Sequence, residues 1–441
     1  MPRWFYFLLI FAVLAPVLAL LQMPPVLVFV VAALGILPLA ALIGQGVEVI
    51  AEHTGERIGG LLFATFGNAP ELIIGIFALS QGLVGVVRAS IIGSILGNVL
   101  LVLGVSVCVG SIKHGRLKFE TRHANQYGSL LILCIGGLVL PAVAELLASH
   151  VHQTQIVERG VSLSDFIAVV LLLGYIASIL FSIFHVGDKG HEDEDEAFSP
   201  VVGARSELAI ERLLAYRQHL AQSSRAGKSG VLRQIDGTLD AILQHENVKQ
   251  GDAALPHALT SADAEKAEVL KKQSGKQETG KPTVPFLGSS LWAGVVLLAL
   301  ATAGVAWLSD ILVSAIEPVT EVLHWNPAFV GLIFVPLIGG LPEYFNTISM
   351  ALDKRMGMVL AASAGSSIQI ALLMAPILVL VSLFMPQHLD LVFSIVELAV
   401  LGLAAFLFSE ITKDGELVWL EGLLLIMLYG MMGGTVFLFG S

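Results

Sequence analysis

Two glutamates, Glu71 and Glu343, each stand in the middle of an apolar stretch of this chain. The stretches 59–101 and 331–373 align without a gap at a constant offset of 272 residues, and the glutamates fall at the same place in both. A carboxylate inside a bilayer costs several kcal/mol and therefore indicates function. Substrate sites of repeat-built transporters lie at the repeat interface near the midplane. The pair thus predicts one shared ion site in a secondary transporter.

Residues that interrupt helices precede both glutamates. Gly67 and Pro70 stand before the first, and Gly339, Gly340 and Pro342 stand before the second. Glycine and proline weaken a helix, and proline removes one of its hydrogen bonds and frees a carbonyl. Such backbone is tolerated at membrane depth only where it is buried in protein or lines a wet cavity. We expect a helix break beside each carboxylate.

Neutral oxygens accompany the two carboxylates. Side-chain amides and hydroxyls in or near the aligned stretches are Asn68, Ser94, Asn98, Ser366, Ser367 and Gln369. Hard cations such as Ca²⁺ prefer an all-oxygen site, so we expect Glu71, Glu343 and Asn68 to contact the cation. For the serines a packing role is the alternative, because Gly93-Ser94 and Gly365-Ser366 are small-residue pairs.

Two facing carboxylates also predict how transport is coupled. Like charges repel when the site is empty, so protons and a divalent cation compete for the same oxygens. Two protons neutralise what one Ca²⁺ neutralises, which is a physical basis for exchange. Glu397 also lies within an apolar span, and a proton relay through it is a further hypothesis.

Composition agrees with a membrane protein that positions such a site on helices. Hydrophobic residues make up 56% of the 441 residues and charged residues 13%, and the mean hydropathy is +0.83, well above the range of soluble proteins. Apolar windows long enough to cross a bilayer recur eleven times. They lie near 4–21, 25–44, 57–80, 84–110, 124–148, 162–185, 288–308, 328–351, 356–381, 389–409 and 416–438.

We predict an all-α membrane protein with an N-terminal helix followed by two five-helix repeats. The predicted units are an N-terminal transmembrane helix (1–24), a first repeat (25–185), a cytoplasmic insert (186–287) and a second repeat (288–441). The first helix is expected to be retained, and a cleaved signal peptide is the alternative. An odd number of crossings in each five-helix unit makes the two repeats inverted.

Basic loop residues set the expected orientation, because Lys and Arg favour the cytoplasmic side. They occur in three short loops: Lys113, Arg116, Lys118 and Arg122 in one, Lys354 and Arg355 in the next, and Lys413 in the last. All three loops fall on one side if the N-terminus is cytoplasmic and the C-terminus outside. The opposite loops are nearly free of Lys and Arg, with Arg88 and Arg159 as exceptions.

The polar insert and the remaining residues narrow the function further. The insert opens with an acidic run, His191 to Glu196, which is either a solvated linker or a weak Ca²⁺-responsive segment. Cys108 and Cys134 lie within predicted spans and indicate neither a disulfide nor a thiolate metal site. We predict no enzymatic activity, no cofactor and no nucleic-acid partner. The expected partners are Ca²⁺, H⁺ and the lipid bilayer, and a homo-oligomer is compatible with the sequence.

These residues resemble the Ca²⁺/H⁺ antiporters of the cation/Ca²⁺ exchanger superfamily. The likeness is carried by Gly67 to Glu71, by GSILGNVLLVLG from Gly93, by GSSIQIAL from Gly365 and by DGELVWLEGLLLIMLY from Asp414. It implies eleven helices, with the two glutamates as central carboxylates and Asn68, Ser94, Ser366 and Gln369 as supporting groups. It also implies gating by the second and seventh spans sliding against the core.

The second half departs from that family pattern. Gly340 stands where the family has Asn before the glutamate, and Tyr344 where it has His after it. Asn346, about one turn after Glu343, is a possible substitute for the missing amide. Pro342 makes this segment more similar to Na⁺/Ca²⁺ exchangers, so a Na⁺-coupled Ca²⁺ exchanger is the alternative function. We expect the plasma membrane of a prokaryote as the location.

Overall fold

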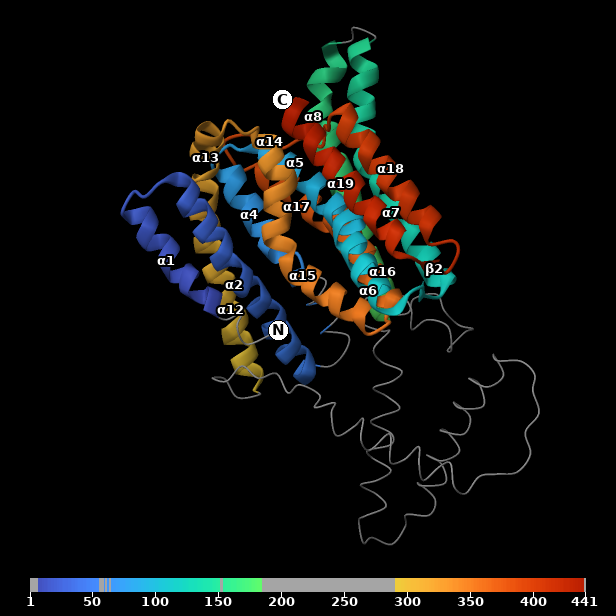
Figure 1. Cartoon of the computed structure of the whole chain (residues 1–441). Helices are drawn as coiled ribbons and strands as arrows, with labels where there is room; N and C mark the ends of the chain where they lie inside the picture. The colour runs from blue at the N-terminus through green and yellow to red at the C-terminus, as the bar shows by residue number, and fades with distance from the viewer. Residues whose placement is uncertain are drawn as a thin grey trace, which may run out of the picture. The chain divides into compact units, whose positions relative to one another are not determined.

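The computed structural model of the chain describes residues 7–54, 59, 62, 65–150, 154–184 and 290–439, and almost all of them are helical (Figure 1). In the first half the helices are α1 (Leu9–Leu20), α2 (Pro25–Thr54), α4 (Ala69–Ser80), α5 (Val84–Leu96), the π-helical segment η2 (Gly97–Val102), α6 (Leu103–His114), α7 (Thr121–His150) and α8 (Thr154–Phe184). The predicted insert, 186–287, lies outside the described residues.

The second half repeats this layout in its helices. It contains α12 (Leu291–Ser314), α13 (Ile316–Leu323), α14 (Pro327–Phe329), η5 (Val330–Phe334), α15 (Val335–Leu352), α16 (Met356–Gln369), η6 (Ile370–Met374), α17 (Ala375–Ser382), α18 (Ile395–Ile411) and α19 (Trp419–Phe439). The π-helical segments η2 and η6 fall at corresponding places in the aligned stretches, because residue 97 corresponds to residue 369. Single π-helical turns inside α-helices occur frequently at functional sites.

The chain is a multi-pass membrane protein. Eight helical stretches among the described residues are long and apolar enough to cross a bilayer, and Leu9–Leu20 and Ala69–Ser80 are shorter apolar helices. Together with α18 they correspond one to one to the eleven predicted spans. Large apolar side chains point outward on many helices, among them Leu133, Leu173, Leu300 and Phe406. In water this would be a large exposed apolar surface, and in a bilayer it faces lipid.

Several predicted boundaries differ from the structure; α8 begins at Thr154 and not near 162, and α12 ends at Ser314 and not near 308. The second span was expected at 25–44, but α2 continues to Thr54. The tenth was expected at 389–409, but α18 begins only at Ile395, where a capping box forms. The Ser394 hydroxyl accepts from the Glu397 amide at 3.3 Å, and a Glu397 carboxylate oxygen accepts from the Ser394 amide at 2.8 Å. Glu397 is half-buried at this helix start and its carboxylate accepts from Ser394, so a capping role accounts for it in place of the proton-relay hypothesis.

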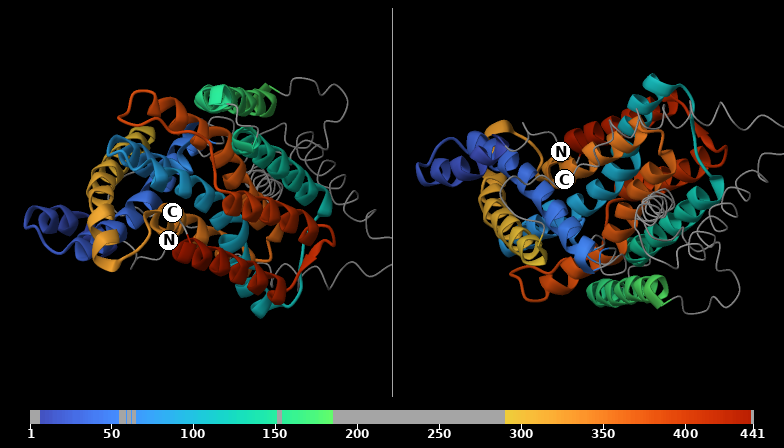
Figure 2. Two further views of the ribbon diagram at one scale, coloured as in Figure 1. Left: turned by 90° about the horizontal axis from the view of Figure 1, so that it is seen from above. Right: turned by 90° about the horizontal axis from the view of Figure 1, so that it is seen from below.

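Helices α1, α2 and α12 form one body at the edge of the protein, and α7, α8 and α18 lie at the other edge (Figures 1 and 2). Glycines bring α2 and α12 into close contact. A Cβ at Gly46 would lie 3.0 Å from the Leu298 amide nitrogen, and one at Gly294 would lie 3.1 Å from the Val49 Cβ. Small residues allow membrane helices to approach closely, and here they join corresponding helices of the two halves.

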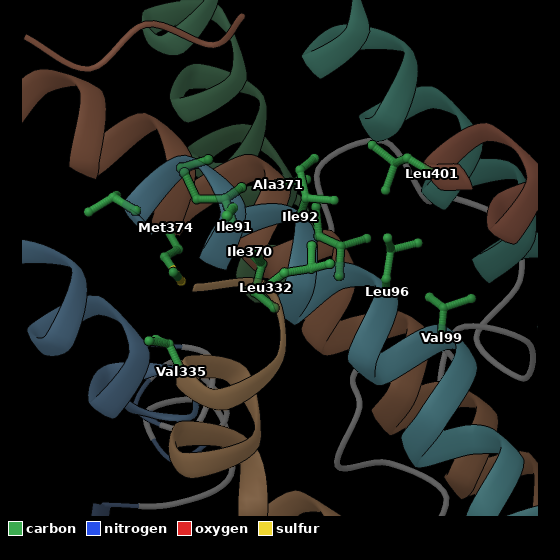
Figure 3. Close-up of a cluster of buried hydrophobic side chains, with 14 of the residues drawn as sticks. Ile91, Ile92, Leu96, Val99, Leu332, Val335, Ile370, Ala371, Met374 and Leu401 are labelled. Atoms are coloured by element: carbon green, nitrogen blue, oxygen red, sulfur yellow. The ribbon is translucent and has the colours of Figure 1, made fainter. Parts of the chain in front are cut away.

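The buried centre is made where α5 crosses the second half. Gly93 of α5 packs so closely that a Cβ there would overlap the Leu332 carbonyl, and Gly331 packs in the same way on the Val86 carbonyl. Around these contacts Ile91, Ile92 and Leu96 meet apolar side chains of η5, η6 and α15 (Figure 3). Gly93 therefore has a packing role. All residues of α5 except Gly85 and Arg88 are buried, which agrees with its mostly apolar sequence.

The loops at one end of the helices are tied together by a short ladder that the all-α prediction did not include. Strand β1 (Leu117–Lys118) pairs antiparallel with β2 (Glu416–Leu417), and Arg116 forms an ion pair with Glu416 at 2.5 Å. Lys113 donates to the Leu352 carbonyl at 3.3 Å. These contacts bring all three basic loops to the same end of the protein, as the charge pattern predicts. Arg88, the exception, is paired with Asp390.

Candidate functional site

The first half of the site begins where the third span is interrupted. Gly67 and Asn68 form a turn, and α4 starts at Ala69 with Pro70 in its first turn, as the sequence predicts. Proline is well tolerated there because the first amides of a helix have no intrahelical partner. Glu71 follows in the same turn and is only 4% exposed. The positive end of the helix dipole favours a carboxylate at this place.

Asn68 stands at the cap position of α4 but does not cap it. Its amide nitrogen instead donates to the Gln369 side-chain oxygen at 3.2 Å. This bond joins the first half to the end of α16 in the second half. The structure thus brings together two predicted site residues that are far apart in the sequence, and it leaves the Asn68 Oδ1 atom without a partner among the described residues.

The second half is arranged differently from the prediction. Helix α15 runs without interruption from Val335 to Leu352 and contains Pro342, so the expected break at Gly339, Gly340 and Pro342 is wrong. Proline has no amide to donate, so it removes one hydrogen bond from the helix without ending it. The reason is that packed neighbours hold the helix together here, which overrides the local preference.

The two glycines of α15 have another function, which is to make room for Glu71. A Cβ at Gly339 would lie 2.7 Å from the Glu71 Cδ and 3.0 Å from its Oε1. A Cβ at Gly340 would lie 3.4 Å from the same oxygen. The Glu71 carboxylate therefore rests directly on the α15 backbone, one turn before Glu343.

Glu343 has a hydrogen-bond donor of its own. The Ser366 hydroxyl of α16 donates to its Oε1 at 2.8 Å. Glu343 follows Gly339 by one helical turn, and Gly339 is in contact with the Glu71 carboxylate, so the two carboxylates lie beside neighbouring turns of α15 and repel each other when both are charged. Ser94 corresponds to Ser366 in the repeat, but its buried hydroxyl has no hydrogen bond among the described residues, and neither has the Glu71 Oε2.

Helices α5 and α16 are held together by serines beside the π-helical segments. Ser363 donates to the Asn98 carbonyl at 2.5 Å, and Ser367 donates to the Ile95 carbonyl at 3.2 Å. Ile95 and Ser367 are themselves corresponding residues, 272 positions apart. Asn98 is buried at this crossing and takes part through its main chain. The π-helical turn of η2 changes the direction of the carbonyls at this point.

Asn346 and Tyr344 differ from the sequence interpretation. Asn346 is exposed on α15, and none of the hydrogen bonds found among the described residues joins it to either glutamate. Tyr344 lies closer to the site, with its hydroxyl near Gly97 of η2 and near the Tyr429 hydroxyl of α19. Sequence reasoning missed Ser363 and Tyr429. For Ser363 the available signal was its spacing of four residues from Ser367, which places both on one helix face.

The ligands gathered here are two carboxylates and neutral oxygens. Within the described ranges, no three His, Cys, Asp or Glu side chains are grouped so that they could hold a metal ion. Three buried oxygens lack partners in one region, from Asn68, Glu71 and Ser94. Buried polar atoms are nearly always satisfied, so unsatisfied ones indicate a missing ion, water or proton. Oxygen donors in this combination suit a hard cation.

The chain belongs to the sodium/calcium exchanger protein family, whose pattern it matches over residues 24–184 and 293–438. Among curated proteins it is 30% identical over 440 residues to the Ca²⁺/H⁺ antiporter ChaA of Bacillus subtilis, covering 99% of this chain and 100% of that protein. It is also 30% identical over 410 residues to a Ca²⁺/H⁺ antiporter of Synechocystis sp., covering 93% of this chain and 90% of that one.

Solved structures agree with this family. The structure of native YfkE has 27% sequence identity and a TM-score of 0.67, covering 98% of this chain and 99% of that one. The crystal structure of the H⁺/Ca²⁺ exchanger CAX has 11% identity and a TM-score of 0.57, covering 99% of this chain and 92% of that one, which is a likeness of fold. The predicted family resemblance is therefore confirmed, and the protein is a transporter by family.

Proposed function

We propose that this protein is a secondary antiporter that exchanges Ca²⁺, or a similar divalent cation, for H⁺ by alternating access. The observation that carries the proposal is the buried Glu71 carboxylate, which rests on α15 one turn before Glu343 and has one oxygen without a partner among the described residues. Relatives named as Ca²⁺/H⁺ antiporters that align over nearly the whole chain support it.

Protons and cation compete for these two carboxylates. A divalent cation neutralises the repulsion between Glu71 and Glu343, and so do protons placed on them. Because the neutralising ions exclude one another, release of one is coupled to uptake of the other. Asn68, Ser94, Ser366, Gln369 and carbonyls near the π-helical turns supply neutral oxygens.

Alternating access is proposed to involve α2 and α12. Their glycine contacts hold them together as one body with α1, and this body lies against the helices that carry the site. We place the two five-helix repeats in inverted orientation, with the basic loops and the insert in the cytoplasm, the N-terminus inside and the C-terminus outside. The clustering of the basic loops at one end supports this orientation.

Uptake of radiolabelled Ca²⁺ into everted membrane vesicles tests the proposal. An imposed pH gradient is expected to drive uptake, and a protonophore is expected to abolish it. Glu71→Gln and Glu343→Gln keep the side-chain shape but cannot carry charge or a transferable proton, so each is expected to lose exchange. Glu397→Gln is the matched control, because that residue caps α18 away from the site. Normal exchange by either site variant would contradict the paired-carboxylate mechanism.

A second candidate is a Na⁺-coupled exchanger of the same superfamily. It is favoured by the Pro-Glu pair that both halves carry, Pro70-Glu71 and Pro342-Glu343. The same vesicles decide between the two coupling ions. If an imposed Na⁺ gradient drives Ca²⁺ uptake and a protonophore does not affect it, the coupling ion is Na⁺ and not H⁺.

A further inference from the structure

The two positions that correspond in the repeat to the hydrogen-bonded pair Asn68 and Gln369 are both glycine. Asn68 and Gln369 are joined by a hydrogen bond at 3.2 Å. At the repeat offset of 272, Asn68 corresponds to Gly340, and Gln369 corresponds to Gly97. If the repeats were equivalent, an amide pair would join these two positions as well. Both positions are glycine, so the second half has no such pair.

Two tyrosines occupy the space that the missing amides leave. A Cβ at Gly97 would lie 4.0 Å from the Tyr344 hydroxyl and 4.0 Å from the Tyr429 hydroxyl. A Cβ at Gly340 would lie 4.0 Å from the Tyr344 ring carbon Cε2. Tyr344 therefore extends from Gly340 to Gly97, across the distance that an amide pair would cover. Tyr429 reaches the same point from α19 and is 6% exposed.

Tyr344 is also close to both carboxylates of the site. It directly follows Glu343 in α15, and its ring lies beside Gly340, which is in contact with the Glu71 carboxylate. A Cβ at Gly340 would lie 4.0 Å from the Tyr344 Cε2 and 3.4 Å from the Glu71 Oε1, so the ring and the carboxylate both lie beside Gly340. A tyrosine hydroxyl inside a protein normally has a polar partner, and the Tyr344 and Tyr429 hydroxyls both lie 4.0 Å from a Cβ at Gly97.

We propose that the Tyr344 and Tyr429 hydroxyls complete the cation site on the second half, in place of the absent amide pair. This inference rests on the proposed exchange function and adds ligands to the same site. A phenolic hydroxyl is a neutral oxygen that accepts, and it also donates. It can contact a cation through its oxygen, and it can donate to a carboxylate after the cation has left. An amide side chain also accepts and donates, but through two different atoms, whereas the phenolic oxygen does both at one position.

Calcium binding by the purified full chain in detergent, measured by titration calorimetry at several pH values, tests this role separately from transport. Tyr344→Phe and Tyr429→Phe keep the ring and remove only the hydroxyl. Each is expected to raise the half-saturating Ca²⁺ concentration roughly tenfold, the effect of one lost polar contact, and to change its pH dependence. Tyr175→Phe is the matched control, because Tyr175 is also a buried tyrosine but lies on α8.

A second variant distinguishes the loss of a cation ligand from a loss of packing as the cause of lower Ca²⁺ affinity. Gly340→Asn in the Tyr344→Phe background restores an amide where the first half has one, and the 3.4 Å between a Cβ at Gly340 and the Glu71 Oε1 is an ordinary contact. Recovery of Ca²⁺ affinity in this double variant would support a ligand role.

Several results would overturn the inference. Wild-type affinity and pH dependence in both phenylalanine variants would do so, and so would a wild-type protein that binds no Ca²⁺. A different result would separate the two proposals. If the wild-type protein binds Ca²⁺ and both variants bind it more weakly, but a pH gradient moves no Ca²⁺ in wild-type vesicles, the ligand role is supported and the proposed exchange function is contradicted.

Discussion

The Ser366 hydroxyl donates to the Glu343 carboxylate at 2.8 Å, and this bond has no counterpart in the first half. Ser94, the corresponding serine, is 4% exposed and has no hydrogen bond within the described part of the chain. The two glutamates are equivalent in the repeat but not in their surroundings. Glu343 has a donor, whereas Glu71 has an unpartnered oxygen that remains available to an ion.

Serine substitutions should therefore differ in effect at neutral pH. Ser366→Ala removes a hydrogen bond to a charged group, which typically contributes about 1.5–3 kcal/mol. We expect it to raise the half-saturating Ca²⁺ concentration of exchange by about tenfold or more. Ser94→Ala breaks no hydrogen bond found in this structure, so a smaller effect is expected. Vesicle uptake at varied Ca²⁺ measures both, and equal effects of the two variants would contradict the asymmetry.

A side chain at Gly339 should impair exchange without preventing folding, because it would displace the Glu71 carboxylate. The Cβ of Gly339→Ala would lie 2.7 Å from the Glu71 Cδ, so the carboxylate must move. The protein should fold, because alanine favours a helix over glycine by about 1 kcal/mol, while exchange should fall at least tenfold. Gly402→Ala in α18, where a Cβ meets no atom within 4 Å, is the control. Normal exchange by Gly339→Ala would disprove this placement of Glu71.

The sequence was sufficient for the spans, the family and the pairing of the two glutamates across the repeat. Hydropathy alone locates membrane helices, because the bilayer removes every alternative for the backbone. The repeat offset then pairs Glu71 with Glu343 and Ser94 with Ser366. These are properties of composition and register, and they do not depend on how the helices pack.

What sequence reasoning could not supply came from packing. Gly339 and Gly340 read as helix breakers next to Pro342, but in a tightly packed helix they accommodate the carboxylate of another helix. Tyr429 is 86 residues beyond Glu343 in the chain, and only the docking of α19 on α6 and η2 brings it to the site. A short-range pattern contains no signal for such a contact.

The capping box of α18 predicts a loss of stability without a loss of exchange. Ser394→Ala removes a side-chain cap, which typically costs about 1 kcal/mol. We expect a lower thermal unfolding midpoint in detergent and unchanged Ca²⁺ affinity in vesicles. Glu397→Gln keeps an acceptor oxygen for the Ser394 amide and should be nearly neutral in both measurements. Loss of proton coupling in Glu397→Gln would restore the proton-relay hypothesis.

The Asn68–Gln369 contact should show energetic coupling. Asn68→Ala and Gln369→Ala each remove one partner of the 3.2 Å hydrogen bond. If the bond matters for the site, the double variant should weaken Ca²⁺ uptake by less than the two single effects combined, with a coupling energy of about 0.5–1.5 kcal/mol. The half-saturating Ca²⁺ concentrations of the four proteins give this energy. Strict additivity would mean that the two amides act independently on the ion.

The last prediction concerns the movement of α2 with α12. A Cβ at Gly294 would lie 3.1 Å from the Val49 Cβ, near the roughly 3.5–4.5 Å that a disulfide requires. In a protein with Cys108 and Cys134 replaced by serine, Val49→Cys and Gly294→Cys should cross-link on oxidation. Because we propose that the two helices move as one body, oxidised vesicles should exchange Ca²⁺ for H⁺ as reduced ones do. Inhibition on oxidation that a reductant reverses would instead show that α2 and α12 must slide past each other.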